Sequence, residues 1–112
     1  RSVAFETVRD GCARSAGSDW RTTGALAGGG ILVDHGWHAF YLMLGLIGET
    51  PRAIRARTAR DRYPDADVED TAECAIEFPS LEARLFLTWA GAERRTAWSL
   101  VGRDGEIEVI AR

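Results

Sequence analysis

Residues 71–78 read Thr-Ala-Glu-Cys-Ala-Ile-Glu-Phe, and this alternation of polar and apolar side chains, broken only by Ala75, decides the fold. A period of two is typical of a β-strand that buries one face. Cys74 is expected on the buried face with its apolar neighbours, where a free thiol behaves as a small apolar group. Glu73 and Glu77 are expected on the opposite face of the same strand.

The same signal extends outward from this strand in both directions. Further strands are expected over residues 2–8, 53–58, 81–89, 96–101 and 106–110. Arg103-Asp104-Gly105 is typical of a hairpin turn between the last two. Residues 60–69 are acidic and contain Pro64, so we expect a solvated loop. The outer face of 81–89 and 96–101, which we expect to carry Arg84, Phe86, Thr88 or Trp98, could meet a partner or hold scattered surface residues.

One helix is expected, over residues 31–46, followed by Gly48 and Pro51 as stop signals. Its apolar residues cover most of the circumference, which predicts a largely buried helix. The pattern as a whole predicts an α+β domain: a mostly antiparallel open sheet, with the later strands in a meander and one long helix packed on one face.

The composition narrows the possible functions. With 112 residues, 46% of them hydrophobic and a net charge of −3, the chain is expected to form one globular domain without a basic stripe for nucleic acid. No apolar run approaches a membrane span. Cys12 and Cys74 match no metal-ligand spacing. We therefore expect a reduced, cytoplasmic setting. The start at Arg1 rather than Met suggests a fragment or an excised domain.

The sequence Asp34-His35-Gly36-Trp37-His38 follows three glycines at the expected helix start. Asp34 and His38 are four residues apart and would share one face of a regular helix, while His35 would point away from that face. An imidazole beside a carboxylate is equipment for proton transfer, because His titrates near neutral pH. Gly36 between them would leave room for a ligand near the backbone.

Structural alternatives stand beside this hypothesis. Asp34 could be a cap or a first-turn acid, and His38 a hydrogen-bonded core residue. His35 could be structural or line a pocket. The three side chains together lack a fourth partner, so we expect no metal site. Trp20 could simply pack, and Arg21 could hold either a ligand or a structural carboxylate.

Several short motifs follow one another along nearly the whole chain. They are Trp20-Arg21, Gly28-Gly29-Gly30, Asp34-x-Gly36-x-His38, Gly48, Val68-Glu69-Asp70-Thr71-Ala72 and Gly102-Arg103-Asp104-Gly105-Glu106-Ile107. In this order they resemble the C-terminal domain of the Gfo/Idh/MocA oxidoreductases, the family of glucose–fructose oxidoreductase and inositol dehydrogenase. The resemblance implies an α+β domain like the C-terminal domain of dihydrodipicolinate reductase.

The resemblance also implies a two-domain enzyme that acts on a sugar, polyol or similar hydroxy compound. An N-terminal Rossmann domain would bind NAD or NADP, and the present residues 1–112 would be the single C-terminal-type domain, which supplies the substrate pocket and an oligomer-forming sheet. No G-x-G-x-x-G fingerprint occurs in this chain, so the Rossmann domain is expected outside it.

In that family a Lys of the first domain works with an Asp and a His of the second. The matching residues here are Asp34 and His38, which we assign to catalysis, with His38 as the general base. The chain contains no Lys, which fits a Lys that lies in the other domain. Substrate binding is assigned to Trp20, Arg21, His35 and Tyr41, and cofactor binding to Gly30.

One departure concerns Tyr41, which stands where family members often carry a second acid on the helix. A Tyr hydroxyl can bond a polyol but does not accept as a carboxylate does. A non-catalytic ligand-binding or oligomerisation module of the same fold therefore stays open as a second hypothesis. A small ligand-binding domain unrelated to the family is a third.

Overall fold

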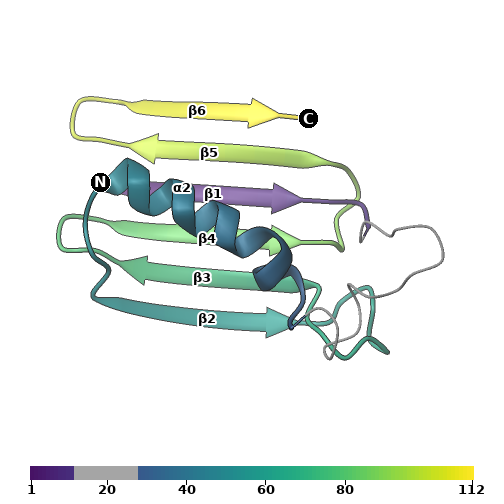
Figure 1. Cartoon of the computed structure of the whole chain (residues 1–112). Coiled ribbons are helices and arrows are strands. Elements are labelled where there is room, and N and C mark those ends of the chain that lie inside the picture. Colours follow the sequence, from purple (N-terminus) through teal and green to yellow (C-terminus); the bar gives the residue numbers. More distant parts are fainter. Residues whose placement is uncertain (12–27) are drawn as a thin grey trace.

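The computed structural model describes residues 1–11 and 28–112. They form a six-stranded sheet with one helix lying across one face (Figure 1). The strands are β1 (Ser2–Val8), β2 (Ala53–Ala59), β3 (Thr71–Glu77), β4 (Glu82–Thr88), β5 (Arg95–Val101) and β6 (Glu106–Ala111). All of the expected strands are present, with ends that differ by a residue at most. The predicted α+β class is confirmed.

The sheet is mixed, because β1 lies between β4 and β5 and runs parallel to only one of them. The strand order is β2-β3-β4-β1-β5-β6, and β1 pairs with β4 in parallel and with β5 antiparallel. The expectation that β4 and β5 are neighbours in a meander is wrong. Alternation within a strand marks its two faces but says nothing about which strand inserts between two others. The hairpin β5–β6 does form, and Gly102 donates to the carbonyl of Gly105 at 2.8 Å.

The register places the buried residues of neighbouring strands in rows beneath the helix. Cys74 stands opposite Leu85, and both are buried. Leu85 in turn stands opposite Phe5, which stands opposite Trp98. The rings of Phe5 and Trp98 have centroids 4.4 Å apart. Trp98 therefore lies on the helix side, and its expected place on the outer face is wrong. Cys74 is buried as predicted, and burial raises the pKa of its thiol.

The helix begins with a π-helical turn, η2 (Leu32–Gly36), and continues as α2 (Trp37–Ile47). It ends as the sequence predicts, since Gly48 takes a left-handed conformation with φ of 72° and donates to the carbonyl of Leu44 at 2.9 Å. No helix of the described residues is long and apolar enough to cross a membrane.

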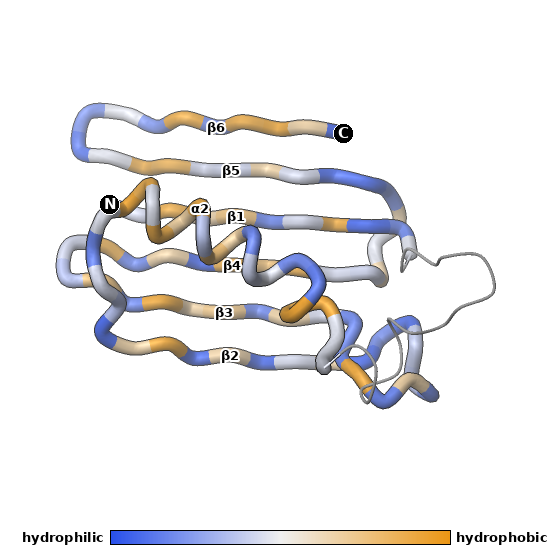
Figure 2. Tube along the Cα trace, in the orientation of Figure 1, coloured by the Kyte–Doolittle hydropathy of each residue, from blue (hydrophilic) through white to orange (hydrophobic). Residues whose placement is uncertain are grey.

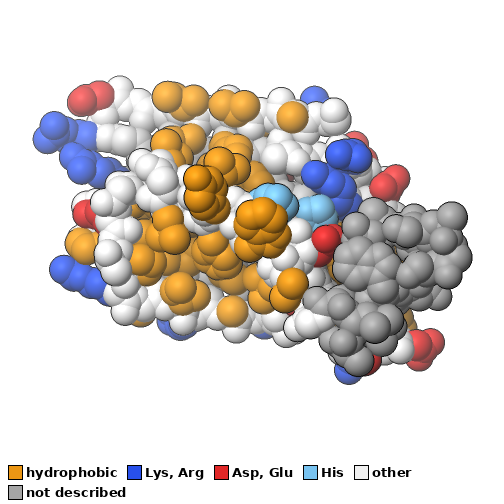
Figure 3. Space-filling view, viewed as in Figure 1, with side chains coloured by type: hydrophobic (Ala, Val, Ile, Leu, Met, Phe, Trp, Pro, Cys, Tyr) orange, Lys and Arg blue, Asp and Glu red, His pale blue; other side chains and the backbone are white. Residues whose placement is uncertain are grey.

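The prediction of a largely buried helix is wrong. Within α2 only Ala39 and Met43 are buried, whereas Trp37 is 60% and Tyr41 75% exposed. A helix on a single sheet can bury only the side that faces the sheet. Phe40 and Ile47 pack partly against the core. Most of the other large apolar side chains of α2 therefore form an exposed surface, visible as the orange ridge over the sheet in Figure 3 and as the mixed colouring of α2 in Figure 2. We call it the outer helix surface; its large members are Trp37, Tyr41, Leu42, Leu44 and Leu46.

Candidate active site

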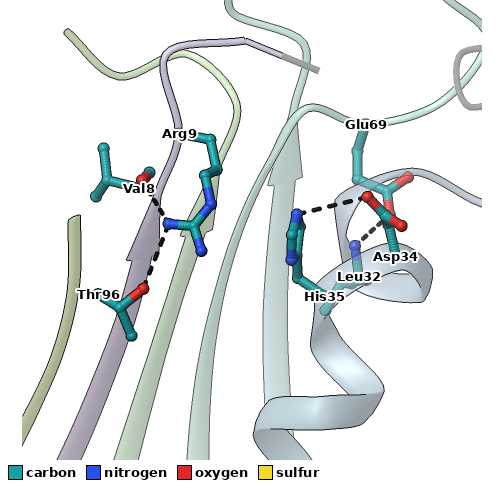
Figure 4. A network of polar contacts seen from close by, with 7 residues as sticks. All are labelled: Val8, Arg9, Leu32, Asp34, His35, Glu69 and Thr96. Atoms are coloured by element: carbon teal, nitrogen blue, oxygen red, sulfur yellow. Dashed lines mark hydrogen bonds and ion pairs between the residues drawn. The ribbon is translucent and has the colours of Figure 1, made fainter. Parts of the chain in front are cut away.

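The carboxylate of Asp34 and the imidazole of His35 lie together at the start of the helix. The distance from Asp34 Oδ2 to His35 Nε2 is 3.4 Å, and the side chains are 27% and 29% exposed (Figure 4). The prediction that His35 points away from Asp34 is therefore wrong. Asp34 lies in a π-helical turn, which is wider than an α-helical one, so the four-residue spacing of a regular helix does not fix its neighbour.

His38 lies one helical turn after Asp34, in the first turn of α2. It is exposed, and its ring lies against that of Trp37 with centroids 3.6 Å apart. The alternative of a core histidine is therefore wrong. Among the described residues His38 makes no hydrogen bond or ion pair, so its imidazole nitrogens are open to a ligand. The structure thus pairs Asp34 with the nearer histidine and leaves the proposed base at the surface beside it.

Glu69, from the loop before β3, holds the start of the helix in place. Its Oε2 accepts from the backbone N–H of Gly30 at 3.0 Å and its Oε1 from that of Leu32 at 3.3 Å. Its carbonyl accepts from the N–H of Ile31 at 3.1 Å. A carboxylate there satisfies N–H groups that have no partner within the helix and interacts favourably with the helix dipole. No side chain of the turn itself caps η2, so Asp34 is a first-turn acid rather than a cap.

Packing requires a glycine at position 30 and leaves little room for a side chain at Gly36. A Cβ on Gly30 would lie 1.8 Å from the carbonyl oxygen of Glu69, so the chain at Gly30 presses against another backbone. Its assignment to cofactor binding stays a prediction. A Cβ on Gly36 would lie 3.3 Å from Leu32 Cδ2 and 3.6 Å from Leu87 Cδ1. The expectation that Gly36 leaves room for a ligand is wrong, because it faces the sheet and is buried.

Asp70 organises the loop that carries Glu69. Its buried carboxylate accepts from the backbone N–H groups of Asp61, Arg62 and Tyr63 at 2.9, 2.7 and 2.9 Å. The Thr71 hydroxyl adds a fourth bond at 2.8 Å. Burial alone would raise the pKa of Asp70, but these bonds to the charged form outweigh it and lower the pKa below its ordinary value. Sequence reasoning missed Glu69 and Asp70 as organising residues, although it marked the acidic pair before a strand.

The remaining assigned residues divide into two groups. Tyr41 is exposed on α2, one turn beyond Trp37. Trp20 and Arg21 lie outside the described residues, as does Cys12.

Within the described ranges, no group of three His, Cys, Asp or Glu side chains could hold a metal ion. Figure 4 adds one residue that sequence reasoning missed, Arg9 after the end of β1, whose guanidinium lies at the same level as the ring of His35.

Comparison with known proteins identifies the family to which the chain belongs. The model of the GFO/IDH/MocA C-terminal domain matches residues 1–108. The chain therefore belongs to the Gfo/Idh/MocA family, and it does so through that family's C-terminal domain. The third hypothesis, a domain unrelated to this family, is excluded. A search of curated protein sequences finds no match.

Solved structures agree on the fold. GenD2 from gentamicin A biosynthesis, solved in complex with NAD, is 29% identical with a TM-score of 0.84, over 97% of this chain and 31% of that one. Aldose-aldose oxidoreductase from Caulobacter crescentus, complexed with glycerol, is 25% identical with a TM-score of 0.69, over 99% and 36%. Levoglucosan dehydrogenase, in complex with NADH and L-sorbose, has the same fold at 20% identity and a TM-score of 0.83, over 97% and 32%. The chain thus spans about a third of the length of these structures.

Proposed function

We propose that this chain is the substrate-binding and catalytic domain of an NAD(P)-dependent oxidoreductase that acts on a sugar, polyol or similar hydroxy compound. One observation carries the proposal: an acid–imidazole pair, Asp34 and His35, lies beside the exposed imidazole of His38 at the helix start. Membership of the Gfo/Idh/MocA family and the resemblance to GenD2, which was solved with NAD, support the reaction class.

In this proposal the side chains of the chain carry out the proton transfer of the reaction. A bound nicotinamide supplies the hydride acceptor or donor. His38 takes the hydroxyl proton when the alcohol is oxidised and returns it to the oxygen when the carbonyl is reduced. Asp34 accepts a hydrogen bond from the ring of His35 or from a second substrate hydroxyl. Tyr41, which is exposed on α2, would bond a further substrate hydroxyl.

The rest of the enzyme would lie outside this chain. We propose that an N-terminal Rossmann domain of the same protein binds NAD or NADP. We also propose that it covers the outer helix surface, because large apolar side chains exposed together are typical of a protein–protein interface. That domain would also supply the Lys absent here. Gly30 would be the point of this chain nearest the cofactor. A cytoplasmic location stays a prediction.

The test uses the full-length protein. Purified enzyme is incubated with NAD or NADP and a panel of sugars and polyols, and formation of reduced nicotinamide is followed. We expect His38→Asn to lower kcat by about a hundredfold to ten-thousandfold, as for loss of a general base. The matched control is Arg103→Gln in the exposed β5–β6 turn, which we expect to leave kcat unchanged. Equal turnover by wild type and His38→Asn would refute the assignment.

A second candidate function, a non-catalytic oligomerisation module, is favoured by the sheet face opposite the helix. A hollow of about 800 Å³ lies there, lined by alternating charges that include Arg55, Arg57, Glu73, Arg84 and Glu108, with Phe86 among them. Opposite charges on one face can complement a second copy of that face. We propose that homo-oligomers form through this surface. Wild-type oligomers that dissociate in a Phe86→Glu variant, together with a full-length chain that turns over no substrate, would favour the module over the enzyme.

A further inference from the structure

Arg9 follows the last residue of β1 on the face that carries the helix. Val3, Phe5 and Thr7 are the buried residues of this strand, and alternation places Arg9 on their side. Both backbone polar groups of Arg9 are hydrogen-bonded. The N–H of Arg9 donates to the carbonyl of Thr88 at 2.9 Å, and its own carbonyl accepts from the N–H of Gly91 at 3.0 Å. Arg9 therefore presents its side chain from a defined position.

The register places this position at the helix start. Gly36 packs over Leu87, and Leu87 stands opposite Thr7 in the sheet. Arg9 is two residues beyond Thr7 along the same face. The Asp34–His35 pair and Arg9 thus lie at the same end of the sheet, and Figure 4 shows the Arg9 guanidinium and the His35 ring at the same level on different elements.

The guanidinium is anchored along one side only. Its Nη1 donates to the carbonyl of Val8 at 2.9 Å, to that of Arg95 at 3.3 Å and to the Thr96 hydroxyl at 3.3 Å. In the described part of the chain no group accepts from Nη2 or Nε. These two nitrogens form the edge that Figure 4 shows turned toward His35. The free edge of a guanidinium offers two parallel N–H donors, which match the two oxygens of a carboxylate or phosphate.

The charges around Arg9 favour the same ligand. Arg95 is neutralised by Glu6, with 3.1 Å between Arg95 Nη1 and Glu6 Oε1. Partial burial and the nearby charge of Arg94 lower the pKa of Arg9, and Asp10 acts in the opposite direction. The acids on the helix side are engaged: Glu69 holds the helix start, and Asp34 holds His35. An anion bound at the free edge of Arg9 would relieve the repulsion between Arg9 and Arg94.

We propose that Arg9 is a specificity-determining residue that binds a carboxylate or phosphate group of the substrate, so that the preferred substrate is an anionic sugar derivative. This inference rests on the proposed function, because it places that anion beside the hydroxyl on which His38 acts. Nη1 holds the guanidinium to the sheet, and the Nε–Nη2 edge holds the ligand.

The experiment compares a neutral aldose, its uronic acid and its phosphate ester as substrates of the full-length enzyme. We expect the wild type to prefer an anionic member; the carboxylate and phosphate arms show which anion fits. Arg9→Gln is expected to raise KM for that substrate about tenfold to hundredfold, as for a charged hydrogen-bonded pair. It should change kcat/KM for the neutral aldose by no more than about twofold. Arg9→Lys keeps the charge but not the two parallel donors, so its KM for the anionic substrate should lie between those of the wild type and Arg9→Gln.

Binding without turnover provides the second readout, because Arg9 also helps to hold β1 to β5. Calorimetric titration of the same three compounds into folded wild type and Arg9→Gln measures affinity directly, with Arg103→Gln as the control. Anion binding that depends on Arg9 in a protein that turns over nothing would support this inference and refute the proposed function. Equal losses for neutral and anionic compounds, or a wild-type preference for the neutral aldose, would overturn the inference.

Discussion

The carboxylate of Asp34 lies 3.4 Å from the imidazole of His35, its immediate neighbour in the chain. This distance exceeds the 2.7–2.9 Å or so of a strong charge-assisted hydrogen bond, and both side chains are more than a quarter exposed. The pair is therefore a loose one that a substrate hydroxyl could enter. We therefore expect the pair to contribute little to the stability of the fold.

A double-mutant cycle tests this conclusion. We expect the Asp34→Asn and His35→Asn substitutions to show a coupling energy of about 0–1 kcal/mol in urea unfolding, because solvent screens a partly exposed pair. In the full-length enzyme, by contrast, Asp34→Asn should lower kcat/KM about tenfold or more through loss of a charged hydrogen bond to the substrate. A coupling energy well above this range, with unchanged kinetics, would make the pair purely structural.

The sequence could predict the strands because each has a buried face and an exposed one. The row through Cys74 and Leu85 follows from that alternation. The place of β1 could not be predicted, since insertion between β4 and β5 depends on contacts between segments far apart in the chain. Burial of the helix was overestimated because apolar residues all round a helix do not show how many layers cover it.

The site was predicted in part for similar reasons. The motif located Asp34, His35 and His38 at the helix start, but regular α-helical spacing did not predict that Asp34 lies against His35. The contribution of Glu69 could not be read from its neighbours, because it reaches N–H groups more than thirty residues earlier in the chain. Arg9 was missed since a lone Arg after a strand carries no motif.

Gly30 and Gly45 give a matched pair of substitutions with opposite expected signs. A Cβ at Gly30 would meet the backbone of Glu69, which cannot rotate away, so Gly30→Ala should destabilise the fold by about 2–3 kcal/mol. A Cβ at Gly45 would meet nothing within 4 Å inside α2, so Gly45→Ala should stabilise it by about 0.5–1 kcal/mol. Urea unfolding followed by circular dichroism measures both. A neutral Gly30→Ala would mean that the helix start moves freely from Glu69.

Asp70 should carry much of the stability of the loop at residues 60–69. Asp70→Asn replaces an acceptor of several bonds by a group with one acceptor oxygen, and we expect a loss of about 2–4 kcal/mol. Asp65→Asn, at an exposed position of the same loop, should change little. The folded-state pKa of Asp70 is lowered, so its contribution is complete above the unfolded pKa, near 4, and is lost as pH falls toward and through the folded value. The stabilities of wild type and Asp70→Asn should therefore converge across this acidic range. A difference that stays constant with pH would contradict a stabilising role for the hydrogen bonds to the charged Asp70 carboxylate.

Nicotinamide binding should differ between this domain and the full-length protein that we propose. The chain contains no G-x-G-x-x-G sequence, and the one glycine assigned to the cofactor presses against Glu69 rather than facing open space. We therefore expect NADH fluorescence titration of the 112-residue chain to give a Kd no tighter than about a millimolar, whereas the full-length protein should bind in the micromolar range. Circular dichroism of the isolated chain should show a folded sheet, so that weak binding cannot be attributed to unfolding. Micromolar binding by the folded chain alone would place a nucleotide site within these residues and contradict the division into two domains.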